Sequence, residues 1–341
     1  MSKRPIRIGM IGAGRIGKVH AQNIARRIPD AEIAAITDVE HGAAEAVALG
    51  CSIPVIAGSA AEIFEDPAID AVLICSPTDT HPDLIVRAAQ SGKHVFCEKP
   101  IALTLPEIDR ALAAVKAAGV QLQVGFNRRF DANFARVRKA VAEAEIGRPS
   151  LLHIISRDPA PPPIAYIRSS GGIFLDMTIH DFDMTRFLLG DEPHEIYAMG
   201  AVMVDAKIGD AGDLDTALTL LRFQSGAMAV IDNSRKASYG YDQRAEVLGD
   251  RGKIETMNCF PNQAILSDGH SVRRDLPLNF FMERYTESFV EEMREFVAAL
   301  REHRPTPVTG DDGRMAVVMA LAARQSYLER RPVRIQEIGE R

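Results

Sequence analysis

The sequence predicts an α/β chain in which a doubly wound parallel sheet precedes a second domain with a large, mostly antiparallel open sheet. Three observations support this prediction. The pattern G-x-G-x-x-G at residues 12–17 lies between a strand pattern and a helix pattern. Strand and helix patterns then alternate to about residue 125. From residue 195 to 274 successive strand patterns are separated by short turns, which favours antiparallel pairing.

In the first part, the uninterrupted apolar run Ala71–Cys75 is typical of a strand covered on both faces. Ser59 and Thr104 each precede a glutamate by three residues, which is the spacing of a capping box, and Gly119 fits the position after a helix end. The sequence places the domain boundary between residues 126 and 127. The expected elements are a helix at 15–27 and strands at 6–11, 32–37, 71–75, 94–97 and 121–125.

After the boundary the pattern changes. One long helix is expected over 173–189, and two helices are expected to close the chain, at 283–301 and 311–328. The other expected elements are a helix at 132–144, a strand at 151–156 before a proline-rich loop, and strands at 195–204, 216–223, 227–233, 244–248 and 253–256.

Composition excludes several classes of function. The chain has 341 residues, 46% apolar and 25% charged, with a net charge of −6, so it has the composition of a soluble globular protein and lacks the basic excess of a nucleic-acid-binding one. Its longest apolar run, Met315–Ala323, is too short to span a membrane. Four cysteines without paired short spacing favour reduced thiols and no metal site, and with no apolar signal region we expect a cytoplasmic protein.

The glycine pattern predicts a dinucleotide site. Gly12 permits a tight turn, Gly14 lets the backbone approach a pyrophosphate, and Gly17 packs the helix on the sheet. The helix begins there with Arg15 and Ile16, whose end of the helix attracts phosphate.

Asp38 follows the second strand, 21 residues after Gly17, where an acidic side chain accepts hydrogen bonds from ribose hydroxyls. No lysine or arginine lies between Asp38 and Gly50 to neutralise a 2′-phosphate. The sequence therefore predicts NAD rather than NADP, although Asp38 could instead, or also, cap the next helix.

Two further loops follow parallel strands, where ligands bind in such sheets. The first contains Ser76, Thr78 and His81; His81 is either a cofactor contact or a helix-start residue. The second is E-K-P, with Glu98 and Lys99. The Lys99 ammonium could hydrogen-bond a reacting hydroxyl and favour its alkoxide, whereas an isolated turn lysine would be solvated.

Asp176 and His180 are four residues apart in an apolar run, so on a helix they would share one face. A carboxylate beside an imidazole can orient it as a general base. Asp181 and Asp183 would point away from that face. Arg128 and Arg129 follow the last strand of the first domain, one of them a candidate ligand contact. Tyr239 and Tyr241, in a predicted loop, are candidates for a sugar-like ligand or for packing.

In this order, the glycine pattern, S-P-T-x-x-H, E-K-P, G-F-x-R-R-F-D and G-G-x-x-x-D-x-x-x-H resemble the glucose–fructose oxidoreductase / inositol dehydrogenase / MocA family over nearly the whole chain. Segments 156–163 and 170–184 are most similar to bacterial inositol 2-dehydrogenases. The resemblance implies an N-terminal Rossmann domain and a C-terminal domain whose open sheet forms the interface of a homotetramer.

The resemblance also implies roles for single residues. The family's catalytic lysine, aspartate and histidine match Lys99, Asp176 and His180, and its acidic cofactor residue matches Asp38. Its substrate contacts match Arg128 and Asp158, and either Tyr239 or Tyr241. It implies NAD-dependent oxidation of a cyclic polyol, with myo-inositol favoured. A scyllo-inositol, glucose or other sugar dehydrogenase, and a non-catalytic NAD(H) sensor, remain the alternatives. Asn127 stands where inositol dehydrogenases often have methionine, which leaves polyol preference open.

Overall fold

The computed structural model describes residues 4–339, which form two compact units. The first unit runs to Phe130 and includes Glu287–Val317; the second comprises Asp131–Thr286 and the chain from Val318. Among the described residues, no helix is long and apolar enough to cross a membrane.

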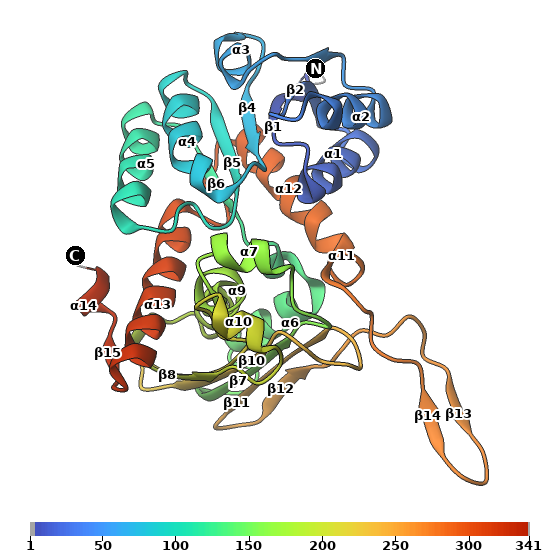
Figure 1. Cartoon of the computed structure of the whole chain (residues 1–341), viewed down its shortest axis with the longest axis vertical. Helices are drawn as coiled ribbons and strands as arrows, with labels where there is room; N and C mark the ends of the chain where they lie inside the picture. Colours follow the sequence, from blue (N-terminus) through green and yellow to red (C-terminus); the bar gives the residue numbers. More distant parts are fainter. Residues whose placement is uncertain (1–3, 340–341) are drawn as a thin grey trace. The chain divides into compact units, whose positions relative to one another are not determined.

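The first unit contains a parallel six-stranded sheet with the order β3-β2-β1-β4-β5-β6 (Figure 1). This order reverses between β1 and β4, as in a doubly wound sheet, so the predicted fold class is confirmed. Ser59 and Thr104 are the residues before α3 and α5, and Gly119 ends α5 with φ of +66°. The strands are β1 (Ile6–Ile11), β2 (Ala31–Thr37), β3 (Val55–Ile56), β4 (Ala71–Ile74), β5 (His94–Glu98) and β6 (Leu122–Gly125). The helices are α1 (Arg15–Arg27), α2 (His41–Cys51), α3 (Ala60–Glu65), α4 (His81–Gln90) and α5 (Leu105–Ala118), with one-turn helices at Thr78–Thr80 and Asn127–Phe130.

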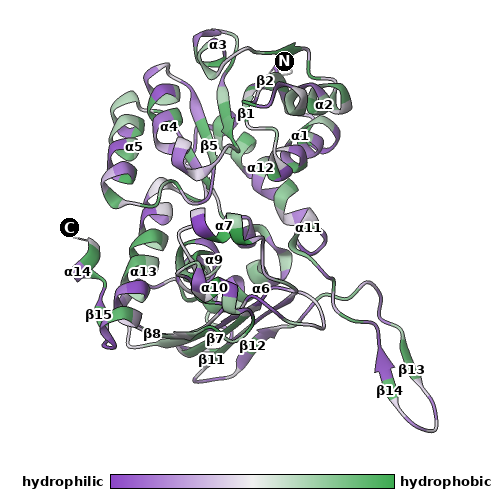
Figure 2. Cartoon of the chain, viewed as in Figure 1, coloured by the Kyte–Doolittle hydropathy of each residue, from purple (hydrophilic) through white to green (hydrophobic). Residues whose placement is uncertain are grey.

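A helix from late in the chain completes the core of this unit. The expected helix at 283–301 is two helices, α11 (Phe281–Arg284) and α12 (Thr286–Glu302). From α12, Met293, Phe296 and Val297 pack among the buried apolar side chains of β1, β2 and α1. Figure 2 shows β1 and β5 as hydrophobic strands, which agrees with burial on both faces.

The second unit contains a seven-stranded sheet with the order β12-β11-β7-β10-β9-β8-β15. Only β7 and β10 pair in parallel; the other neighbours are antiparallel. The strands are β7 (Pro149–Arg157), β8 (Pro193–Ala201), β9 (Thr216–Phe223), β10 (Met228–Ser234), β11 (Asp242–Gly249), β12 (Lys253–Thr256) and β15 (Val333–Arg334). Helices α6 (Ala132–Ala142), α7 (Ile164–Ser169), α8 (Ile173–Asp176), α9 (Ile179–Leu189), α10 (Ala206–Asp210) and α14 (Gln336–Gly339) belong to this unit, and α13 (Gly310–Glu329) spans both units.

The predicted single helix over 173–189 is wrong at its middle. The chain forms α8 and α9 with a break at Met177–Thr178. The Thr178 N–H reaches back five residues to the Ile173 carbonyl (2.9 Å), and the Thr178 hydroxyl donates to Asn233 Oδ1 (2.8 Å). This tertiary hydrogen bond anchors the break, so Asp176 ends one helix and His180 begins the next.

One face of this sheet is open. In Figure 1 the helices of the unit lie along the other face, on which α9 contacts β7. A hairpin of β13 (Ile265–Ser267) and β14 (Val272–Arg274) projects away from the rest of the unit.

Candidate active site

The glycine loop leaves the start of α1 accessible. Gly12 has φ of +102°, and a Cβ there would lie 2.5 Å from the Cys75 carbonyl carbon. A Cβ on Gly17 would lie 2.3 Å from the Gly12 oxygen, whereas one on Gly14 would meet no atom within 4 Å. The first and third glycines therefore make the close turn, and the second faces open space, as a pyrophosphate at the helix N-terminus requires.

Asp38 fixes this loop. Its Oδ2 accepts the Ala13 N–H (2.5 Å), and its Oδ1 accepts the Glu40 N–H just before α2 (2.8 Å). The carboxylate therefore holds both the glycine loop and the backbone just before α2. Asp38 thus also has the local structural role at the start of the next helix that the sequence allows. Its negative charge at the end of β2 also fits a ribose with free hydroxyls. The loop and Asp38 together fit a dinucleotide.

His81 links the two loops that follow β4 and β5. Its ring is 1% exposed, with Nδ1 2.8 Å from the Pro100 carbonyl oxygen and Nε2 2.9 Å from the Ser76 carbonyl oxygen. A neutral imidazole can donate to only one of these oxygens. Burial lowers the pKa of His81, and this effect outweighs the two carbonyl contacts, which raise it. The ring thus serves as a buried tie between loops. Ser76 Oγ lies 2.6 Å from Thr80 Oγ1, and Thr78 begins the one-turn helix there.

The E-K-P turn leaves the end of β5. Glu98 is the last residue of β5, and its Oε1 lies 2.7 Å from Nε2 of His20 on α1. Lys99 follows, half-buried, before the cis peptide to Pro100. The first unit therefore places the glycine loop, Asp38, Ser76 and Lys99 at the carboxyl ends of parallel strands.

In the second unit, Asp176 is held by two side chains that the sequence analysis missed. Tyr166 donates its hydroxyl to Asp176 Oδ1 (2.8 Å), and Arg235 Nη1 donates to Asp176 Oδ2 (3.1 Å). Arg235 is 1% exposed, and its Nη2 donates to Asp213 Oδ2 (3.2 Å). Asp213 in turn accepts the Ile173 N–H at the start of α8 (2.8 Å). Because Arg235 lies far along the chain from Asp176 and Asp213, no local sequence pattern predicts these contacts.

His180 lies half-buried in the first turn of α9. The next residue, Asp181, is fully buried and accepts a hydrogen bond from Asn233 Nδ2 (2.8 Å). Asn233 therefore joins Asp181 to Thr178 at the helix break. Asp183 is also buried, at 1% exposure.

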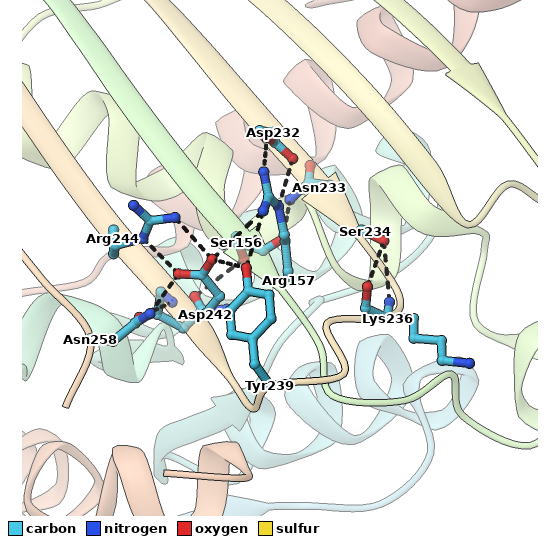
Figure 3. A network of polar contacts seen from close by, with 11 residues as sticks. Ser156, Arg157, Asp232, Asn233, Ser234, Lys236, Tyr239, Asp242, Arg244 and Asn258 are labelled. Carbon is cyan, nitrogen blue, oxygen red and sulfur yellow. Dashed lines mark hydrogen bonds and ion pairs between the residues drawn. The ribbon is translucent and has the colours of Figure 1, made fainter. Parts of the chain in front are cut away.

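Figure 3 shows a polar network at the ends of β7, β10 and β11. Arg157 pairs with Asp232 and donates to the Tyr239 hydroxyl (3.1 Å), which itself donates to Asp242. Arg244 binds the same Asp242 carboxylate (2.7 Å). Burial raises the pKa of Asp242, but the hydrogen bonds from Arg244, Tyr239 and Asn258 outweigh it and hold that pKa below its usual range.

This network concerns three predicted substrate contacts. The Tyr239 hydroxyl is engaged by Asp242 and Arg157, and the buried Tyr241 ring packs edge-on against Tyr285 with centroids 6.0 Å apart. These contacts favour the packing alternative for both tyrosines. The Asp158 backbone is tied to Ser234 and Ala237, so its loop is anchored to the chain that follows β10.

The two arginines after β6 differ. Arg129 pairs with Asp312 (3.0 Å), which gives it a structural partner within the first unit. Arg128 is 5% exposed in the one-turn helix Asn127–Phe130. A ligand contact of Arg128 stays a prediction.

Comparisons with known proteins agree with this geometry. The model of an oxidoreductase family with an NAD-binding Rossmann fold, GFO/IDH/MocA, matches residues 6–126, and the model of the GFO/IDH/MocA C-terminal domain matches residues 134–255. The chain is 48% identical to myo-inositol 2-dehydrogenase of Thermotoga maritima, over 98% of this chain and 99% of that protein. It is 47% identical to inositol 2-dehydrogenase of Rhizobium meliloti, over 97% and 99%.

A solved structure extends the comparison. The scyllo-inositol dehydrogenase of Lactobacillus casei, solved with bound NAD(H) and scyllo-inositol, matches with a TM-score of 0.90 and 30% identity, over 97% of this chain and 99% of that one.

Proposed function

Because the chain belongs to the GFO/IDH/MocA family of NAD-binding oxidoreductases, we propose that it oxidises a ring hydroxyl of an inositol, with myo-inositol as the preferred substrate and the 2-keto product. Relatives named for inositol oxidation match almost the whole chain, at 47–48% identity. The observation that carries the proposal is the setting of Asp176, a carboxylate fixed by Arg235 and Tyr166 four residues before His180.

NAD is the cofactor that the first unit fits. Its glycine loop opens onto the N-terminus of α1, and Asp38 would repel the 2′-phosphate of NADP. When bound, the nicotinamide ring supplies the hydride acceptor. Gly12, Gly14, Arg15, Ile16 and Gly17 would hold the pyrophosphate, and Ser76, Thr78, His81 and Glu98 would support the remainder of the cofactor.

Each proposed catalytic residue has a distinct part in moving the hydroxyl proton. His180 acts as the general base that takes it. Asp176 orients the imidazole and balances its charge, and Arg235 and Tyr166 keep that carboxylate in one position. Lys99 donates a hydrogen bond to the hydroxyl oxygen and stabilises the negative charge that develops there. Arg128 and Asp158 bind the other ring hydroxyls, whose pattern of partners decides among stereoisomers.

The test measures NADH absorbance with NAD⁺ or NADP⁺ against myo-inositol, scyllo-inositol, D-chiro-inositol and D-glucose. We expect NAD⁺-dependent turnover with the highest kcat/KM for myo-inositol. A higher kcat/KM for scyllo-inositol or glucose would keep the chemistry and correct the substrate. NADH binding without turnover of any polyol would replace the enzyme with an NAD(H) sensor.

We also propose that the chain forms a homotetramer through the open sheet face and resides in the cytoplasm. Apolar side chains are exposed on that face, and exposed apolar patches of this kind mark interfaces. All four cysteines are free, which suits a reducing compartment. Sedimentation of the purified chain and fractionation of the producing cells test the two statements; a monomer, or recovery in an oxidising compartment, would contradict them.

A further inference from the structure

Three titratable side chains of the first unit meet beside the E-K-P turn. They are His20 on α1, Glu98 at the end of β5 and Glu292 on α12, and one nitrogen or oxygen of each lies within 4.8 Å of the others. His20 and Glu292 are 0% exposed. The cluster thus connects α1, which follows the glycine loop, the E-K-P turn that contains Lys99, and α12 from late in the chain.

Glu292 is the unusual member. Neither of its carboxyl oxygens has a hydrogen-bond donor among the described residues. The nearby Gln123 amide donates to the Glu292 backbone oxygen (2.9 Å) and not to the side chain. An ionised carboxylate without donors is very costly to bury, and a second carboxylate beside it adds repulsion. Burial, then the charge of Glu98, accordingly raise the pKa of Glu292 well above its usual range.

Three further titratable side chains among the described residues interact with the carboxylates of the cluster. They are the thiols of Cys75, just after β4, and Cys97, on β5, and the imidazole of His81, on α4. Burial raises the pKa of both thiols and lowers that of His81, so it favours the neutral form of all three. His20 Nε2 lies 2.7 Å from Glu98 Oε1, and no described residue bonds His20 Nδ1. A neutral imidazole donating from Nε2 fits both facts, because it leaves no N–H unpaired.

We propose that Glu292 is a positioning residue, which stays in the neutral acid form and donates its proton to the Glu98 carboxylate. Glu98 is then held from two sides, by His20 and by Glu292. Gly125 on β6 closes a third side, since a Cβ there would lie 2.8 Å from Glu98 Oε2. Fixing Glu98 fixes the start of the turn that presents Lys99. Only this last consequence rests on the proposed function.

The first experiment measures thermal stability against pH for the wild type, Glu292→Gln and Glu291→Gln. Glu291 is the matched control, because it is the neighbouring glutamate on α12 and its side chain is 41% exposed. A carboxyl group that is neutral when folded but ionised when unfolded binds a proton on folding, so its contribution to stability falls as pH rises above about 4.3. Glutamine has no such dependence.

We therefore expect the Tm of Glu292→Gln minus that of the wild type to increase steadily from pH 5 to pH 8. The corresponding difference for Glu291→Gln should show no such trend. The infrared C=O band of a protonated carboxyl group should be present in the wild type at neutral pH and absent in Glu292→Gln. A pH-independent Tm difference with no such band would overturn the proposal. So would one equivalent of a transition metal retained by the wild type and lost in Glu292→Gln.

The second experiment separates positioning from mere packing by measuring NAD⁺ binding with calorimetry, which needs no substrate. Glu292→Gln keeps a donor toward Glu98, so its NAD⁺ affinity and kcat should stay near those of the wild type. Glu292→Leu removes a hydrogen bond to a charged group, and its NAD⁺ affinity should fall about tenfold. If Glu292→Leu lowers only the Tm, Glu292 does not position the turn. Failure to oxidise any inositol would count against the proposed function alone.

Discussion

Arg235 is the residue on which the position of Asp176 depends, because its buried guanidinium pairs with both Asp176 and Asp213. Replacing it by methionine would leave two carboxylates without their cation, and breaking such a buried pair costs roughly 3–5 kcal/mol of stability. A displaced Asp176 should also lower kcat about 10²-fold. Thermal unfolding and steady-state kinetics on Arg235→Met check this, with Arg235→Lys as the variant that keeps the charge. Normal kcat in a folded Arg235→Met would remove Arg235 from the site.

His180 and Lys99 are the residues that we propose take part in proton transfer. His180→Ala and Lys99→Ala should each lower kcat by about 10²–10⁴-fold, the usual contribution of such groups. NAD⁺ binding, followed by calorimetry, should change little. His194→Ala and Lys116→Ala make the same changes at exposed positions and should keep kcat. Near-normal turnover in either site variant would show that its role is assigned wrongly.

Asp38 contributes both charge and loop geometry. Asp38→Ser removes the repulsion of a 2′-phosphate and the carboxylate that accepts the Ala13 N–H. Losing hydrogen bonds to a charged group should weaken NAD⁺ binding about 10-fold or more, while NADP⁺ binding improves relative to it. The ratio of kcat/KM for the two cofactors measures this. An unchanged ratio would mean that Asp38 only braces the loop.

At the residue scale, the members of the proposed site that the sequence predicts stand in local patterns, as Gly12, Asp38 and Lys99 do. It did not predict Arg235, Tyr166 or Glu292, because their partners lie far away in the chain and only folding brings them within hydrogen-bond or ion-pair distance. A buried charged residue can be identified only from the residues it pairs with, and a short sequence pattern does not include those partners.

Among the elements, the start of β9 is held by a single carboxylate. Asp215 accepts the N–H groups of Met203, Val204 and Asp205 and the hydroxyl of Thr216. Burial raises the pKa of Asp215, but these four donors outweigh it, and the pKa lies below its usual range. The stability that Asp215 contributes is therefore present above about pH 4 and is lost as pH falls through its lowered folded-state pKa.

Asp215→Asn should accordingly lower the Tm at pH 7, and its difference from the wild type should shrink as the pH falls below about 4. Asp210→Asn, an exposed change on the neighbouring α10, serves as the control and should leave the Tm unchanged at both pH values. A Tm difference that stays constant down to pH 3 would show that the hydrogen bonds of Asp215 do not depend on its charge.

Element prediction from sequence succeeded where periodicity alone decides the structure. Helix α1 and strands β1, β9 and β12 have the predicted bounds, because their apolar positions repeat at the helix or strand period. The helix over 173–189 was predicted whole, since its pattern is apolar throughout. Its break is anchored by the hydrogen bond of Thr178, between α8 and α9, to Asn233 on β10, and a tertiary contact of this kind leaves no trace in the periodicity of the sequence.

For the whole molecule, the position of α12 late in the sequence did not indicate that this helix completes the core of the first unit. An amphipathic helix late in a sequence shows which of its faces is apolar but not which sheet that face covers. Met293 and Phe296 find their partners in β1, β2 and α1 of the first unit. The same reasoning applies to the open sheet face, where the exposed apolar side chains have no partner within the unit's own helices.

That face supplies the last prediction. Leu218 and Leu220 on β9 are 51% and 52% exposed, and Leu218 pairs across the sheet with Met199 on β8, itself 59% exposed. Met228 on β10 and Leu151 on β7, 51% and 40% exposed, pair with each other further along the sheet, where Met228 lies opposite Arg222 of β9. Exposed leucines and methionines gathered on one sheet face are shielded from water when a second copy covers them.

Leu220→Glu would place a charge in the centre of the proposed contact, where it would lose its water without gaining a partner. The variant should sediment as a smaller species than the wild type and keep its fold by circular dichroism, because Leu220 faces away from the core of its own unit. Leu49→Glu, at an 88% exposed position on α2, makes the same substitution outside the face and should leave the assembly intact. Identical sedimentation of Leu220→Glu and the wild type would place the subunit interface elsewhere.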